Sequence, residues 1–161
     1  MKPFTMNNLR LAIGLLIGGI CLLTSCRHDI VYSEFVAIPS GEWDENQLPE
    51  FAFNIADREA AYDILLYVRH TERYPYQNMW LFVRGNRQYM DTVEFYLADD
   101  RGRWLGDKHH GFIEMPVLLE ENYHFPDTGR YYFAVQHGMR DSLLRGVTDV
   151  GIEVIRVKNE R

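Results

Sequence analysis

The feature that most constrains this chain is an apolar run near its N-terminus, residues 11–23, which ends three residues before a cysteine, Cys26. Lys2 and Arg10 precede the run and make the N-terminus cationic. The run has 13 residues, which is short of the roughly 20 that a helix needs to cross a bilayer. A cationic start followed by a short apolar segment is typical of an export signal, so the leader has to be set aside before the fold is predicted.

The residues after the run indicate which kind of export signal this is. Leu23, Thr24, Ser25 and Cys26 resemble a bacterial lipobox, in which an aliphatic residue and two small residues precede the cysteine that receives lipid. A secretory signal without lipid would end in an Ala-x-Ala-like site, and none is present. We therefore predict that the thiol of Cys26 forms a thioether to diacylglycerol, and this covalent lipid is the only cofactor predicted.

Cleavage before Cys26 would leave 136 residues, enough for one domain with its own core. The predicted parts are a leader (1–25), the lipidated cysteine with a short tether (26–29) and a single domain (30–161). The whole chain has a formal charge of −6 and the leader holds only two cations, so the remainder carries −8. A chain this acidic is a poor binder of nucleic acid, whose phosphates need a basic patch. The only other cysteine, Cys21, lies in the leader, so the domain has no disulfide available and depends on its core.

Apolar residues after the leader alternate with a period of two, which is typical of β-strands. The predicted strands are residues 51–55, 62–69, 80–84, 92–97, 112–119, 122–125, 129–137 and 150–157. Residues 62–69 are apolar at most positions on both faces and are predicted to form a central strand buried on both sides. The spacing of strands and turns predicts an all-β fold, an antiparallel β-sandwich that is jelly-roll-like, with a lipocalin-like barrel as the alternative.

Short polar segments separate the predicted strands. Residues 84–87 have the chemistry of a hairpin turn, because Gly85 and Asn86 tolerate positive φ. Residues 99–102 predict a type I turn capped by aspartate. Residues 108–111 are predicted to form a loop, and residues 139–144 either one helical turn or a loop.

The sequence contains no recognisable catalytic motif. It lacks a Gly-x-Ser-x-Gly elbow, a glycine-rich phosphate loop and a His-Glu-x-x-His pattern, and we predict no catalytic residue and no enzyme. His109 and His110 are adjacent in a predicted loop and His124 and His137 follow, but neighbouring residues on a strand point to opposite faces. We predict no metal site. An acidic pair such as Glu120 and Glu121 could supply the two carboxylates of a glycoside hydrolase, although solvated acidic turns are commoner.

Aromatic residues gather at one junction between a loop and a strand: Tyr74, Tyr76 and Trp80. Exposed aromatic rings on a β-sandwich can stack on sugars or contact a partner protein. The alternative is that these rings cap one end of the core. Both interpretations remain open from the sequence.

A set of motifs resembles the gliding-motility lipoprotein GldH family of the Bacteroidota. The matching stretches occur in the family's order and lie at residues 74–83, 91–99, 102–106, 125–131, 139–140 and 146–151, and the lipobox lies where that family has one. The resemblance implies an outer-membrane lipoprotein that supports gliding motility and the type IX secretion apparatus coupled to it. It implies a structural or interaction role without catalysis, and partners among other envelope proteins of that machinery.

The residues after Cys26 bear on which side of the membrane the domain faces. Surface-exported lipoproteins of this phylum tend to carry an acidic run there, whereas this chain has Arg27, His28 and Asp29. We therefore expect a domain that faces the periplasm. A glycan- or ligand-binding lipoprotein of the cell envelope is the alternative function.

Overall fold

The computed structural model describes residues 29–86 and 90–158. The predicted leader, Cys26 and most of the tether lie outside these residues, as does Arg87 of the predicted hairpin turn. Within them the regular secondary structure consists of β-strands and one short 3₁₀ turn, η1 (Pro39–Gly41). The described part of the chain has no helix with the length and apolarity that a membrane span requires.

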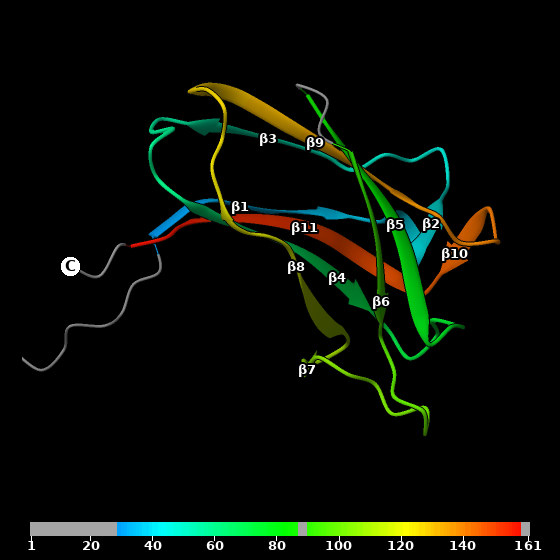
Figure 1. Ribbon diagram of the computed structural model, residues 1–161. Coiled ribbons are helices and arrows are strands. Elements are labelled where there is room, and N and C mark those ends of the chain that lie inside the picture. The colour runs from blue at the N-terminus through cyan, green and yellow to red at the C-terminus, as the bar shows by residue number, and fades with distance from the viewer. Residues whose placement is uncertain (1–28, 87–89, 159–161) are drawn as a thin grey trace, which may run out of the picture.

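The strands form two main antiparallel sheets that pack face to face (Figure 1). The five-stranded sheet contains, in spatial order, β1 (Asp29–Ala37), β11 (Val147–Arg156), β4 (Tyr62–His70), β8 (Ile113–Tyr123) and β7 (Asp107–Lys108). The four-stranded sheet contains β3 (Glu50–Ile55), β9 (Gly129–His137), β5 (Asn78–Gly85) and β6 (Met90–Tyr96). A small third sheet joins β2 (Glu42–Asp44) to β10 (Leu143–Arg145).

The order of pairing shows how the chain is wound. β1 pairs with β11, β3 with β9, β4 with β8 and β5 with β6, so the first half of the chain pairs with the second half in reverse order. The short pair of β2 and β10 continues this two-stranded ribbon where it passes from one sheet to the other. A ribbon rolled in this way is a jelly roll. The predicted antiparallel, jelly-roll-like sandwich is therefore confirmed, and the lipocalin-like alternative is not.

The core lies between the two main sheets and follows the predicted alternation. Every second residue of β3 is buried, and so is every second residue of β4. Phe53 on β3 contacts Tyr32 of the opposite sheet, with ring centroids 5.4 Å apart. β4 is central, as predicted, but only its inner face is fully buried, and the side chains of its outer face are half-buried.

Three local predictions were wrong or incomplete. Residues 112–119 and 122–125 do not form two strands, because β8 runs unbroken from Ile113 to Tyr123. The pairing with β4 shifts register there, and Asn122 adopts a positive φ of 54° while its N–H donates to Asp63 Oδ1 (2.8 Å). The expected loop at residues 108–111 begins within β7, and residues 139–144 include the start of β10.

One glycine holds two chain segments in close contact at the end of the sandwich where β4 ends. Gly146 has φ +88°, and a Cβ built on it would lie 2.4 Å from the backbone N of Tyr74. Its N–H donates to the carbonyl of Gly41 (2.8 Å), and its carbonyl accepts from the N–H of Thr71 (2.7 Å). The link between β10 and β11 therefore packs backbone to backbone against the loop that follows β4.

We expect Gly146→Ala to destabilise the fold much more than Gly102→Ala. Both glycines have positive φ, which costs alanine about 1–2 kcal/mol. A Cβ added at Gly102 would meet open space. A Cβ added at Gly146 would have to displace the backbone of Tyr74, which adds about 1–3 kcal/mol to the loss of stability. Urea denaturation of both variants measures the difference. Equal losses of unfolding free energy would show that the contact between Gly146 and Tyr74 is not tight.

Candidate functional site

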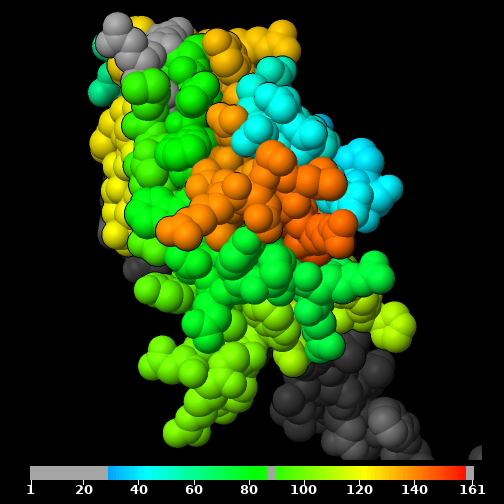
Figure 2. All heavy atoms as spheres, turned by 90° about the vertical axis from the view of Figure 1, so that its right-hand side faces the viewer, coloured from blue at the N-terminus to red at the C-terminus, as the bar shows by residue number. Residues whose placement is uncertain are grey.

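The strand register defines two ends of the sandwich. At the proximal end, where β1 begins, Asp29 is paired with Arg156, and Arg156 with Tyr62. At the distal end Ala37 is paired with Asp149, and Asp149 is also paired with Arg69. The nine residues from Asp29 to Ala37 are separated by eight residue steps, which span about 26 Å at the usual rise of a strand. Figure 2 views the distal end, where the cyan, orange and green parts of the chain meet.

Tyr74 lies in the core at the distal end and is only 3% exposed. Its hydroxyl donates to the carbonyl of Asn78 (2.8 Å), and burial raises the pKa of this phenol. Its ring contacts His70 and Trp104, with centroids 5.7 and 6.4 Å away. The hypothesis that Tyr74 belongs to an exposed binding surface was therefore wrong, since this ring caps the core.

Tyr76 and Trp80 are placed differently. Tyr76 is half-buried against Tyr74, and its hydroxyl donates to Asp141 Oδ2 (2.7 Å), a hydrogen bond that raises the pKa of the phenol. Trp80 lies on the outer face of the four-stranded sheet and is 38% exposed. The structure thus separates the three predicted aromatics into a core residue, a boundary residue and a surface residue.

Trp80 belongs to an exposed group that we call the aromatic strip: Trp80, Phe82 and Tyr96. Trp80 and Phe82 are two residues apart on β5 and share its outer face. Tyr96 on β6 is paired with Asn78, which places it diagonally next to Trp80. The strip therefore places three exposed aromatic side chains close together on the outer face of the four-stranded sheet.

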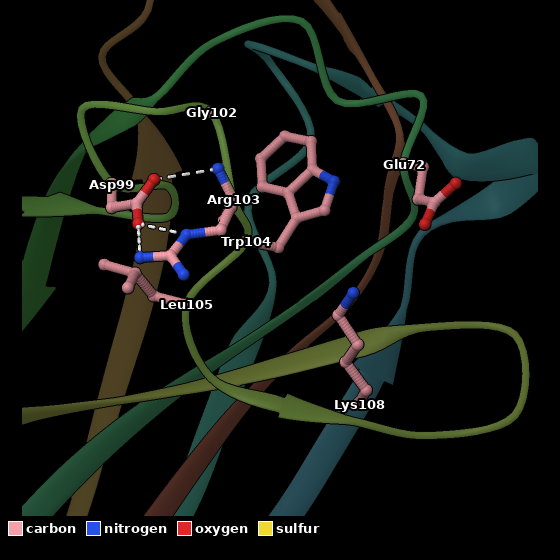
Figure 3. A pocket seen from close by; sticks show the side chains of 7 residues that line it. All are labelled: Glu72, Asp99, Gly102, Arg103, Trp104, Leu105 and Lys108. Carbon is pink, nitrogen blue, oxygen red and sulfur yellow. Dashed lines mark hydrogen bonds and ion pairs between the residues drawn. The ribbon is translucent and has the colours of Figure 1, made fainter.

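A cleft of about 720 Å³ opens beside the loop between β6 and β7 (Figure 3). Its described lining contains neither a histidine nor a hydroxyl or thiol nucleophile, and consists of Glu72, Asp99, Gly102, Arg103, Trp104, Leu105 and Lys108. In Figure 3 the ammonium group of Lys108 points toward the space between Trp104 and Glu72. Charged groups of both signs around one indole ring can bind a polar ligand. They provide no activated nucleophile.

The wall of this cleft is fixed by the predicted turn at residues 99–102. Asp99 Oδ1 accepts the N–H groups of Arg101 and Arg103 (2.9 Å each), and its other oxygen pairs with the Arg103 guanidinium at 2.8 Å. The hydrogen bond from the Arg103 N–H is the main cause that lowers the pKa of Asp99. The aspartate-capped turn is therefore confirmed. Its place in the wall of a cleft was not predicted, because the cleft also depends on Glu72 and Lys108, which are distant in sequence from the turn or belong to another element.

The histidines considered as metal ligands do not converge. His109 and His110 are exposed beyond β7, His124 is exposed beyond β8, and His137 is buried beside Trp43. Residues 29–86 and 90–158 contain no group of three His, Cys, Asp or Glu side chains that could hold a metal ion. His70 belongs to no motif in the sequence, and it is fully buried against Trp104, with ring centroids 4.7 Å apart.

Two comparisons relate this chain to known proteins. A family model described as GldH lipoprotein matches residues 30–154. The chain is 29% identical over 160 residues to the "Gliding motility lipoprotein GldH homolog" of Christiangramia forsetii, covering 92% of this chain and 97% of the relative. It is 25% identical over 152 residues to the "Gliding motility lipoprotein GldH" of Flavobacterium johnsoniae, covering 88% and 94%. The family resemblance predicted from the motifs is confirmed.

The two buried histidines predict how stability depends on pH. Burial lowers the pKa of both His70 and His137 below the usual 6.5, although each ring lies 3.1 Å from a backbone carbonyl to which it can donate. Below about pH 6.5 these two histidines become protonated in the unfolded chain, whereas in the folded chain they stay neutral until the pH is lower. The stability that these groups contribute is therefore complete above pH 6.5 and is lost as the pH falls toward their folded pKa values.

Urea denaturation between pH 8 and pH 5 tests this expectation. His70→Asn and His137→Gln each retain an amide N–H near the position of the donating ring nitrogen but cannot be protonated. The unfolding free energy of the double variant should fall less steeply with acidity than that of the wild type. Parallel pH profiles would contradict the expectation.

Proposed function

Because the chain belongs to the GldH lipoprotein family, we propose that it is an outer-membrane lipoprotein, lipidated on Cys26, whose domain faces the periplasm. In this proposal it has a non-enzymatic, structural or interaction role in gliding motility and in the associated type IX secretion machinery. The names of both relatives support a motility role, and membership of a lipoprotein family supports anchoring to a membrane of the cell envelope.

The separation of the two ends of the sandwich is the observation that carries the proposal. β1 begins at Asp29, so only Arg27 and His28 stand between its first residue and Cys26. Three residue steps reach at most about 10 Å, so a lipid on Cys26 would keep the proximal end close to the bilayer. The distal end, about 26 Å away along β1, would then project toward other proteins.

A deletion strain that carries plasmid-borne variants tests the proposal. We expect the wild-type gene to restore gliding and secretion of type IX cargo, and Cys26→Ser to restore neither. Each buried CH₂ of an acyl chain contributes about 0.8 kcal/mol to membrane binding, and the serine variant would lose all of this. Membrane fractionation and palmitate labelling report the anchor directly.

Cys21→Ser is the matched control, because Cys21 is the chain's other cysteine and lies within the predicted leader. It should remain labelled and functional. Normal gliding and normal secretion in the uncomplemented deletion strain would refute the motility role. Labelling of the Cys26→Ser protein would refute the assignment of the lipidation site.

The aromatic strip supports a second candidate function, glycan or ligand binding. Trp80, Phe82 and Tyr96 are exposed by 38, 36 and 60%, and aromatic faces of this kind can stack on sugar rings. If wild-type protein binds to a glycan panel, Trp80→Ala and Phe82→Ala should each weaken that binding by about tenfold, the loss of about 1.4 kcal/mol. Tyr132→Ala is the control, because Tyr132 is 50% exposed on β9 outside the strip. Failure of the wild type to bind any glycan would exclude this function.

A further inference from the structure

A second cavity at the distal end, of about 640 Å³, is lined by two arginines from different parts of the chain. We call it the arginine pocket, and its described lining residues are Ser40, Gly41, Glu42, Thr71, Arg73, Arg145, Gly146 and Thr148. They come from three segments: η1 with the start of β2, the loop after β4, and the end of β10 with the start of β11. In Figure 2 these regions are the cyan, green and orange parts that meet on the distal face.

Backbone hydrogen bonds fix the three segments relative to one another. Besides the two bonds made by Gly146, the N–H of Ile38 donates to the carbonyl of Thr148 (2.8 Å). Ser40 adopts a left-handed conformation with φ 59°, which a residue with a side chain rarely adopts. A strained residue between fixed segments is typical of sites that are shaped before the ligand arrives.

The charge of the pocket differs from that of the chain as a whole. Within residues 29–86 and 90–158, no carboxylate lies at ion-pair distance from Arg73. Arg145 Nε lies 3.4 Å from Glu42 Oε1, and both side chains are well exposed, at 74 and 44%. A guanidinium has five N–H donors, so this contact leaves several of them available. The lining therefore contains two arginines and one glutamate, which leaves it net positive on a protein whose net charge is negative.

This chemistry fits a carboxylate ligand. The planar guanidinium group binds carboxylates through two parallel hydrogen bonds, and two such groups can hold neighbouring acidic side chains. The described lining contains no aromatic ring on which a sugar could stack. The pocket also lies at the end of the sheet opposite to the start of β1, which places it far from lipid headgroups if Cys26 is the anchor.

We propose that the arginine pocket binds an acidic peptide segment of a partner protein. Arg73 and Arg145 hold its carboxylates. The hydroxyls of Thr71 and Thr148 donate to the backbone carbonyls of Gly146 (3.5 Å) and Arg69 (3.3 Å), so they help to fix the walls of the pocket. This inference deepens the proposed function and rests on it for the existence of a protein partner. It assigns the partner a chemical character, a short run of aspartate or glutamate.

Calorimetric titration of the full-length lipidated protein in detergent micelles tests this inference. The probe is an acetylated tetraglutamate peptide, and tetraglutamine and inorganic phosphate are the comparison ligands. We expect saturable binding of tetraglutamate only. Arg73→Gln and Arg145→Gln should each weaken it at least tenfold, while Arg73→Lys, which keeps the charge without the planar fork, should weaken it less.

Arg58→Gln is the matched control, because Arg58 is an exposed arginine that pairs with Glu59 at 3.0 Å and lies just before β4 begins, near the proximal end. Its binding should equal that of the wild type, and thermal unfolding should confirm that all variants fold. Absence of saturable binding to the wild type, an equal loss in Arg58→Gln, or phosphate binding as tight as peptide binding would each overturn the inference. These outcomes are independent of the complementation assay, so failure here is distinguishable from failure of the motility role.

Discussion

The pairing of β4 with β11 and β8 is the interaction on which the rest of the structure depends. β4 lies in the middle of the five-stranded sheet, and Ile64, Leu66 and Val68 on its inner face are fully buried. Its two neighbours come from the second half of the chain, so the sheet cannot form until distant segments meet. The other strands pair along the same two-stranded ribbon, and the connections from one pair to the next cross between the two main sheets. The rolled topology is thus a consequence of which strands pair with the centre.

The same register creates the distal surface. β4 ends at His70 and β11 begins at Val147, and these two residues are paired, so the loop after β4 and the link before β11 must lie side by side. Arg73 and Arg145 are brought to one pocket in this way, although they are far apart in sequence. At the same end of the sandwich, the rings of Tyr74, His70 and Trp104 pack against one another. The strand pairing that buries the core at this end therefore also forms the arginine pocket.

Sequence periodicity predicted what depends on burial and local turn chemistry. The alternation in β3, β4 and β9 and the aspartate-capped turn at Asp99 are local signals, and the structure has them where they were expected. The pair of β2 and β10 was missed because strands of three residues are too short to show a period and exist only through their partner. Tyr74 illustrates the same limit for sites, because an aromatic ring next to a loop has the same local sequence whether it faces solvent or Trp104. The arginine pocket could not be predicted, since it depends on long-range register.

The position of β1 has a mechanical consequence for a tethered protein. In the part of the chain that the structure describes, β1 is an edge strand that pairs only with β11, and it is the first strand after the predicted tether. A load applied between the membrane and the distal end would act along the strand axis, at right angles to the hydrogen bonds between β1 and β11. Such a load shears all of these bonds together instead of opening them one at a time. Rupture then requires the whole row to fail at once, so an anchor on this strand resists tension better than one on a strand that could be peeled away.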